Sequence, residues 1–90
     1  MCKRAKFHSG RIVATPGVLS LINGSDLLEC LLRHLSGDWG DLCEEDKKEN
    51  DFSLGHRLRL LSAYDTVDGK LWIITEADRS ATTFLLPEEY

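Results

Sequence analysis

Ninety residues with a formal net charge of −4 suffice for one domain with a single hydrophobic core. The hydrophobic share of 42% and the charged share of 29% are ordinary for a globular protein, and no apolar run approaches the roughly 20 residues of a membrane span. These values exclude a membrane-spanning chain. Cys2, Cys30 and Cys43 lack zinc or redox spacing, so we expect reduced thiols, a cytosolic chain and no cofactor.

Residues 1–10 form a basic lead, which we expect to be flexible, before a single α+β domain over residues 11–90. The basic side chains at this end are Lys3, Arg4, Lys6 and Arg11. The segment is too short, and too poor in aromatic residues, to indicate nucleic-acid binding. Nucleic acid is therefore not the expected partner.

A short edge strand and a short helix are expected next. Residues 11–15 form a β-branched run that favours a strand added to the edge of a sheet. Thr15 suits the N-cap of a helix, and Pro16 suits its first position. We expect this helix to run from Pro16 to Ile22, where Asn23-Gly24 ends it.

The clearest helical pattern runs from Asp26 to about Leu35, with Ser25 as the expected N-cap. Its apolar side chains recur at helical spacing and form one wide stripe, which we expect to cover the sheet. The stripe consists of Leu27, Leu28, Leu31, Leu32 and Leu35.

A turn and a third helix follow. Two glycines bracket Asp38-Trp39 and predict a tight turn. Asp41 is the expected N-cap of a surface helix from Leu42 to about Asp51, with Glu44 as its capping-box partner. Phe52 and Leu54 are expected to return the chain to the core.

The stretch 57–86 predicts a three-stranded antiparallel meander that packs on the helices in two layers, an α+β fold. Asp68-Gly69 is the expected two-residue turn, because Gly accepts a positive φ, and it would pair Tyr64 with Ile73. A four-residue turn over 77–80 would pair Ile73 with Phe84.

Alternation along these strands sorts the side chains into two faces. Face one, which the helices should cover, holds Leu58, Leu60, Ser62, Tyr64, Leu71, Ile73, Thr75, Phe84 and Leu86. Face two holds Arg57, Arg59, Leu61, Ala63, Asp65, Trp72, Ile74, Glu76, Ala81, Thr83 and Leu85. Its apolar centre is Leu61, Trp72, Ile74 and Leu85, beside Arg57 and Arg59. This pattern indicates either a surface for a protein partner or a homodimer, or a second core surface under the N-terminal segment.

Candidate catalytic groups are few. A turn could bring His34, Asp38, Asp41 and Glu45 together for a metal-assisted hydrolase, but cap and turn chemistry also explain the aspartates. We therefore assign no catalytic residue and no metal ligand.

Three other motifs have double interpretations. Trp39 is expected to anchor the turn to the core, or else to recognise a partner. Asp78 and Arg79 at the second hairpin tip are either a solvated turn or a recognition pair. The acidic third helix is either a solvated face or a DNA mimic, although Lys47 and Lys48 interrupt its carboxylates.

Four motifs resemble a family of small uncharacterised bacterial proteins found on plasmids and other mobile elements, often labelled plasmid-related. They are GDWGDL at 37–42, EEDKxxN at 44–50, LLSAY at 60–64 and WIITEADRSxTTxLLPEEY at 72–90. The resemblance covers the chain from about Thr15 and supplies no catalytic residues. It implies a cytosolic accessory protein of bacterial mobile DNA. We expect this protein to act as a protein-interaction module that self-associates or counters a host defence system.

Overall fold

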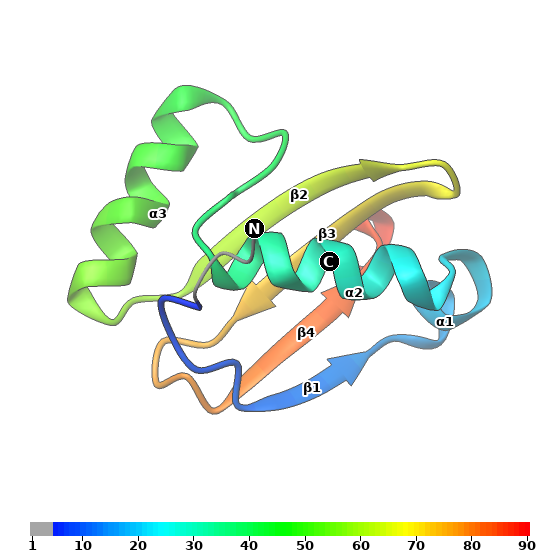
Figure 1. Ribbon diagram of the computed structural model, residues 1–90, viewed down its shortest axis with the longest axis horizontal. Coiled ribbons are helices and arrows are strands. Elements are labelled where there is room, and N and C mark those ends of the chain that lie inside the picture. Colours follow the sequence, from blue (N-terminus) through cyan, green and yellow to red (C-terminus); the bar gives the residue numbers. More distant parts are fainter. Residues whose placement is uncertain (1–4) are drawn as a thin grey trace.

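The fold has two layers, a four-stranded sheet and the helices α1 and α2, which lie across one face of the sheet (Figure 1). This is a computed structural model, and it describes residues 5–90. Cys2, Lys3 and Arg4, part of the expected basic lead, lie outside the described residues. In chain order the elements are β1 (Arg11–Ala14), α1 (Pro16–Leu21), α2 (Gly24–Leu35), α3 (Glu44–His56), β2 (Leu60–Thr66), β3 (Gly69–Thr75), β4 (Ala81–Leu85) and the 3-10 turn η1 (Pro87–Glu89).

The predicted α+β class is confirmed, whereas the three-stranded antiparallel sheet is wrong in part. The strand order is β1-β4-β3-β2, and β1 runs parallel to β4. The expected N-terminal edge strand is therefore present, and it makes the sheet mixed. Its ends are fixed by main-chain bonds from Arg11 N to the Ser80 carbonyl, 2.9 Å, and from Thr15 N to the Phe84 carbonyl, 3.0 Å.

The predicted pairing of β2 with β3 is wrong by two residues. Tyr64 pairs with Leu71, not with Ile73, because the turn residues are Val67 and Asp68. The Thr66 hydroxyl fixes this turn: it accepts the Asp68 N–H at 3.1 Å and donates to the Gly69 carbonyl at 2.7 Å. A slip of two residues leaves every side chain on its predicted face.

The predicted pairing of β3 with β4 is confirmed. Ile73 lies opposite Phe84, and the Glu76 N–H donates to the Ala81 carbonyl at 3.0 Å. Trp72 lies opposite Leu85, and the residues of face one and face two separate as expected.

The caps decide where the helices begin. Thr15 caps α1 as predicted, because its hydroxyl accepts the Val18 N–H at 3.2 Å. The predicted Ser25 cap of α2 is wrong: Asn23 accepts the Asp26 N–H at 3.0 Å, so α2 begins at Gly24.

The third helix lies further along the chain than predicted. It begins after Cys43, not after Asp41, and it continues to His56. Asp41 does not cap it, because its carboxylate accepts the Asp65 N–H at 2.8 Å. Phe52, expected in the core, lies exposed on α3 and stacks on His56 with ring centroids 3.9 Å apart.

The hydrophobic core lies between α1, α2 and face one. Leu27 and Leu31 of the predicted leucine stripe pack against it, but Leu28 and Leu32 are exposed. The core is therefore narrower than the stripe suggested. Its buried members are Val18, Ile22, Cys30, Tyr64, Leu71, Ile73, Phe84 and Leu86. Within residues 5–90, no helix is long and apolar enough to cross a bilayer.

Candidate functional site

The outer edge of β2 is occupied by the segment that leads into and along α3. Asn50 acts as a substitute strand: its amide donates to the Leu61 carbonyl, and its oxygen accepts the Leu61 N–H at 3.2 Å. Gly40 forms a parallel bridge to Ala63, with the Asp41 N–H donating to the Ala63 carbonyl at 2.7 Å. These bonds hold residues 41–46 beside the border of face two.

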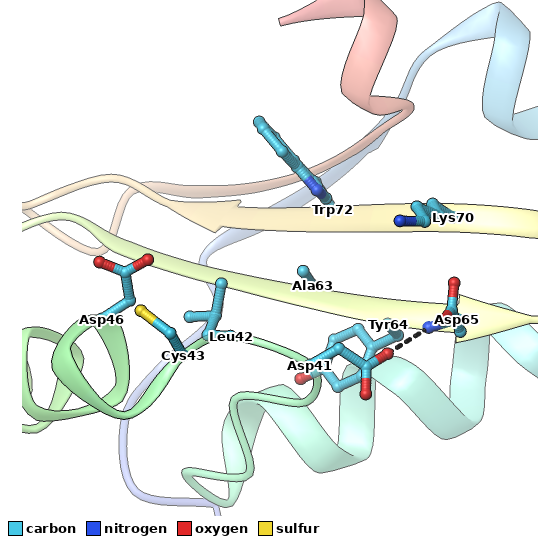
Figure 2. Close-up of a pocket in the computed structure, with 9 residues that line it drawn as sticks. All are labelled: Asp41, Leu42, Cys43, Asp46, Ala63, Tyr64, Asp65, Lys70 and Trp72. Carbon is cyan, nitrogen blue, oxygen red and sulfur yellow. Dashed lines mark hydrogen bonds between the residues drawn. The ribbon is translucent and has the colours of Figure 1, made fainter.

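A groove of about 270 Å³ lies where this segment meets face two (Figure 2). Residues 41–46 form one wall, and β2 with β3 form the other side. In the close-up Trp72 projects from β3 on the side opposite α2, and Asp46 projects from α3. The lining residues are Asp41, Leu42, Cys43, Asp46, Ala63, Tyr64, Asp65, Lys70 and Trp72.

The chemistry of the groove combines an apolar floor with a mostly acidic rim. Leu42, Ala63 and Trp72 supply carbon surface, and three carboxylates line the groove beside a single ammonium, that of Lys70. An aromatic face next to carboxylates suits a cationic group with an apolar stem, because cation–π attraction and ion pairing then act together. The lining thus contains the types of group that bind cationic side chains.

The predicted interface residues of face two separate into buried and accessible members. Ile74 and Leu85 are buried, with 4% and 7% of their surface exposed, whereas Leu61 and Trp72 are half-buried. Tyr90 contacts the Trp72 ring edge to face, with centroids 5.5 Å apart. The accessible part of the apolar centre is thus Leu61 and Trp72, and of these two Trp72 lines the groove.

The two predicted interface arginines differ in their surroundings. The Arg59 guanidinium lies 5.9 Å from the Tyr90 ring centroid and 3.9 Å from a Glu76 carboxylate oxygen. Arg57 is exposed at the C-terminus of α3, where its positive φ of 54° ends the helix. Only Arg59 is positioned beside the aromatic pair on face two.

The hydrolase residues do not form a site. The His34 ring is fully buried, with Nδ1 2.5 Å from the Ser62 hydroxyl and Nε2 2.8 Å from the Thr75 hydroxyl. Asp38 pairs with Arg33 at 2.8 Å, while Asp41 accepts from the main chain of β2. In the part of the chain that the structure describes, no three His, Cys, Asp or Glu residues are grouped to hold a metal ion.

His34 belongs to a buried hydrogen-bond chain that fixes its tautomer. The Thr82 hydroxyl donates to the Ser9 carbonyl at 2.8 Å, so it accepts from Thr75, which in turn accepts the Nε2–H of His34. Nδ1 then accepts from Ser62. Burial, together with the charge of Arg79, lowers the pKa of His34 to about 3.

Trp39 lies where a structural anchor would lie. Only 3% of its surface is exposed, and its indole N–H donates to the Asp51 carboxylate at 2.9 Å. The ring also stacks on Phe7 at 6.4 Å and meets the His34 ring edge to face at 5.7 Å. The carboxylate acceptor replaces the main-chain carbonyl that a tight turn would suggest.

Arg79 reaches from the hairpin tip into the protein. Its guanidinium donates to the carbonyls of Leu58 at 2.6 Å and Ser53 at 3.3 Å, and it lies 5.6 Å from the Phe7 ring centroid. Burial lowers the pKa of Arg79. Asp78 stays in the turn, where it accepts the Ser80 N–H at 3.0 Å. The two residues therefore do not form a joint recognition pair.

Sequence reasoning did not identify Asn50 or the buried role of His34. Asn50 has no local signal, because its partner Leu61 lies eleven positions away. The buried role of His34 did have a signal in the sequence. Ser62 and Thr75 occupy face one, and hydroxyls at buried positions need a polar partner. A histidine on the covering helix supplies that partner.

In comparisons with known proteins, no protein-family model, no curated protein and no solved structure matches the chain.

Proposed function

We propose that this chain is a protein-interaction module whose groove beside Trp72 receives a basic side chain of another protein. The observation that carries the proposal is the asymmetry of the sheet. Helices α1 and α2 pack on face one, whereas η1 and Tyr90 lie against face two and the groove at its border stays open. A partly accessible Trp next to polar side chains is typical of interaction surfaces.

The setting of this function comes from the motifs. GDWGDL and WIITEADRSxTTxLLPEEY resemble those of plasmid-borne proteins, so we propose a cytosolic accessory protein of bacterial mobile DNA. Small proteins of mobile elements often act on host defence systems, and a component of such a system is the proposed partner. The acidic lining of the groove also limits what the partner can present: the segment of the partner that enters the groove should carry Arg or Lys.

Two variants of α3 test the proposal with the same change of charge. Asp46→Lys places a cation in the groove, whereas Glu45→Lys changes an exposed neighbour outside its lining. A partner captured from host lysate and then purified should bind the Asp46→Lys protein at least about tenfold more weakly, or roughly 1.4 kcal/mol, and the Glu45→Lys protein unchanged. A short arginine-containing peptide should compete with it.

Equal binding of the partner to both variants would overturn the proposal, as would a partner that the peptide does not displace. The hydrolase alternative has a separate readout. A melting temperature that rises with a divalent ion, and does not rise in Asp38→Ala, would favour that alternative instead.

A further inference from the structure

The outer edge of β1 is open. In a parallel ladder, alternate residues turn their N–H and C=O groups toward the neighbouring strand. Arg11 and Thr15 donate toward β4, at 2.9 Å and 3.0 Å, so Ile12 and Ala14 turn their main-chain groups outward. Among residues 5–90, no main-chain or side-chain partner meets them there. Such an edge is a template for another strand.

Exposed apolar side chains flank this edge on both faces. Ile12 pairs with Thr82 and lies on face one, 46% exposed, while Val13 pairs with Thr83 and lies on face two, 39% exposed. Leu28 and Leu32 on α2 are 58% and 59% exposed.

The two leucines lie on the side of α2 turned away from Arg33, and both are exposed. The opposite flank carries Arg33, whose guanidinium lies 4.7 Å from the ring centroid of Tyr64 on β2. At about 100° per residue, Leu28 and Leu32 lie roughly 100–140° around the helix from Arg33. In Figure 1, β1 is the outermost strand and α2 does not cover it.

Opposite charges lie at the two ends of β1 on face two. Arg11 begins the strand and shares the register of Ala81, a face-two residue. At the other end the Thr15 hydroxyl donates to a carboxylate oxygen of Glu89 at 2.6 Å. An antiparallel copy of this edge would bring each charge opposite its complement.

We infer that two copies of this chain pair along β1 to form a twofold dimer with a continuous eight-stranded sheet. The outward groups select the register: Ile12 bonds Ala14 of the second copy, and Val13 lies opposite its own copy on the axis. Arg11 then lies opposite Thr15 of the second copy and next to Glu89 of that copy. Every contact occurs twice, as an isologous interface requires.

A second copy fits this edge because the edge is self-complementary in main-chain polarity, in charge and in apolar side chains. A ladder of four residues alone is far smaller than the roughly 800 Å² per partner of a stable interface. Ile12 lies on the same face of the sheet as α2, so we expect the exposed Leu28 and Leu32 of both copies to add apolar area there. The surface is separate from the groove, so the dimer does not depend on the proposed function.

Sedimentation equilibrium of the full chain over a wide concentration range tests the dimer. We expect a dimer that Leu28→Lys and Leu32→Lys each weaken at least about tenfold, because a buried Lys charge is costly. Both residues are exposed in the single chain, so circular dichroism and the melting temperature of the dilute monomer should stay unchanged. Val67→Lys at the far hairpin tip, a position 92% exposed, is the matched control and should leave the dimer intact.

Arg11→Glu tests the charge arrangement, with Lys48→Glu on α3 as the control for net charge. The first should weaken the dimer about tenfold and the second should not. A wild type that stays monomeric at every concentration overturns the inference. A dimer that tolerates Leu28→Lys, Leu32→Lys and Arg11→Glu, or one that Asp46→Lys dissociates, overturns it as well, since another surface is then responsible.

Discussion

The two edge strands of the sheet, β2 and β1, differ in whether their outward main-chain groups have hydrogen-bond partners. Along β2, the outward main-chain groups of Leu61 and Ala63 are bonded by Asn50, Trp39 and Asp41. Along β1, no segment within residues 5–90 plays that part. The same chain thus closes one edge with the Asn50 side chain and the main chain of residues 39–41, and leaves the other edge available. Because open edges promote association, this difference indicates that β1 is an assembly edge and β2 is not.

Removal of the Trp39 ring should have the largest effect on the closed edge. Trp39→Ala leaves a cavity against Phe7 and His34 and should lower the free energy of unfolding by about 3–5 kcal/mol. Ile12→Ala at the open edge should cost under about 1 kcal/mol in the dilute monomer, because nearly half of that side chain is already exposed. Urea unfolding measures both. Equal losses would mean that the two edges do not differ in packing.

The His34 chain ties β2 to β4 beneath α2, and pH should weaken it. The folded-state pKa is about 3, below the ordinary value of 6.5, so the unfolded chain binds the proton more tightly. The contribution of His34 to the free energy of unfolding is therefore fully present above about pH 6.5 and is lost as pH drops toward 3, by roughly 4–5 kcal/mol. His34→Gln should flatten the curve in urea unfolding, and His56→Gln, at an exposed position, should not. A His34→Gln curve with the wild-type slope would contradict this prediction.

A pair of glycines gives the smallest and most specific test of the closed edge. Gly40 has φ +75°, and a Cβ there would lie 2.0 Å from the Ala63 carbonyl oxygen. Gly40→Ala should cost about 2–3 kcal/mol, because both the backbone conformation and the bridge to β2 become strained. Gly55→Ala in α3, where a Cβ meets nothing within 4 Å, should stabilise by about 0.5–1 kcal/mol. Thermal unfolding distinguishes the two variants. An unchanged melting temperature in Gly40→Ala would mean that the bridge to β2 does not contribute to stability.

The sequence was sufficient for the faces of the sheet but not for its edges. Side-chain alternation assigns Trp72 to face two and Phe84 to face one in any register that slips by an even number of residues. For that reason the error of two residues at Val67-Asp68 did no harm to the predicted core. Thr66 caused the error, because its hydroxyl closes the turn one position earlier than Asp68-Gly69 suggests.

The groove and the buried polar chain depend on tertiary contacts that no local pattern contains. Asp41 matches the rule for a helix N-cap, yet it bonds the main chain of Asp65, 24 positions away. His34 suits a helix C-terminus, yet it contacts Thr75, 41 positions away. In both cases a local rule was enough to explain why the residue occurs at its position, but its hydrogen-bond partner in the structure is distant in the sequence.

The parallel pairing of β1 with β4 also sets an order of events during protein synthesis. The hydroxyl of Thr82 donates to the carbonyl of Ser9, 73 positions earlier, so among residues 5–90 the earliest strand in the chain pairs with the latest. At about 5–20 residues per second, β1 waits roughly 4–15 s for its own partner. Throughout that time the nascent Ile12-Val13 segment has both edges free. The sheet is therefore completed only after the last strand leaves the ribosome, and a chain cut before Ala81 would keep β1 unpaired.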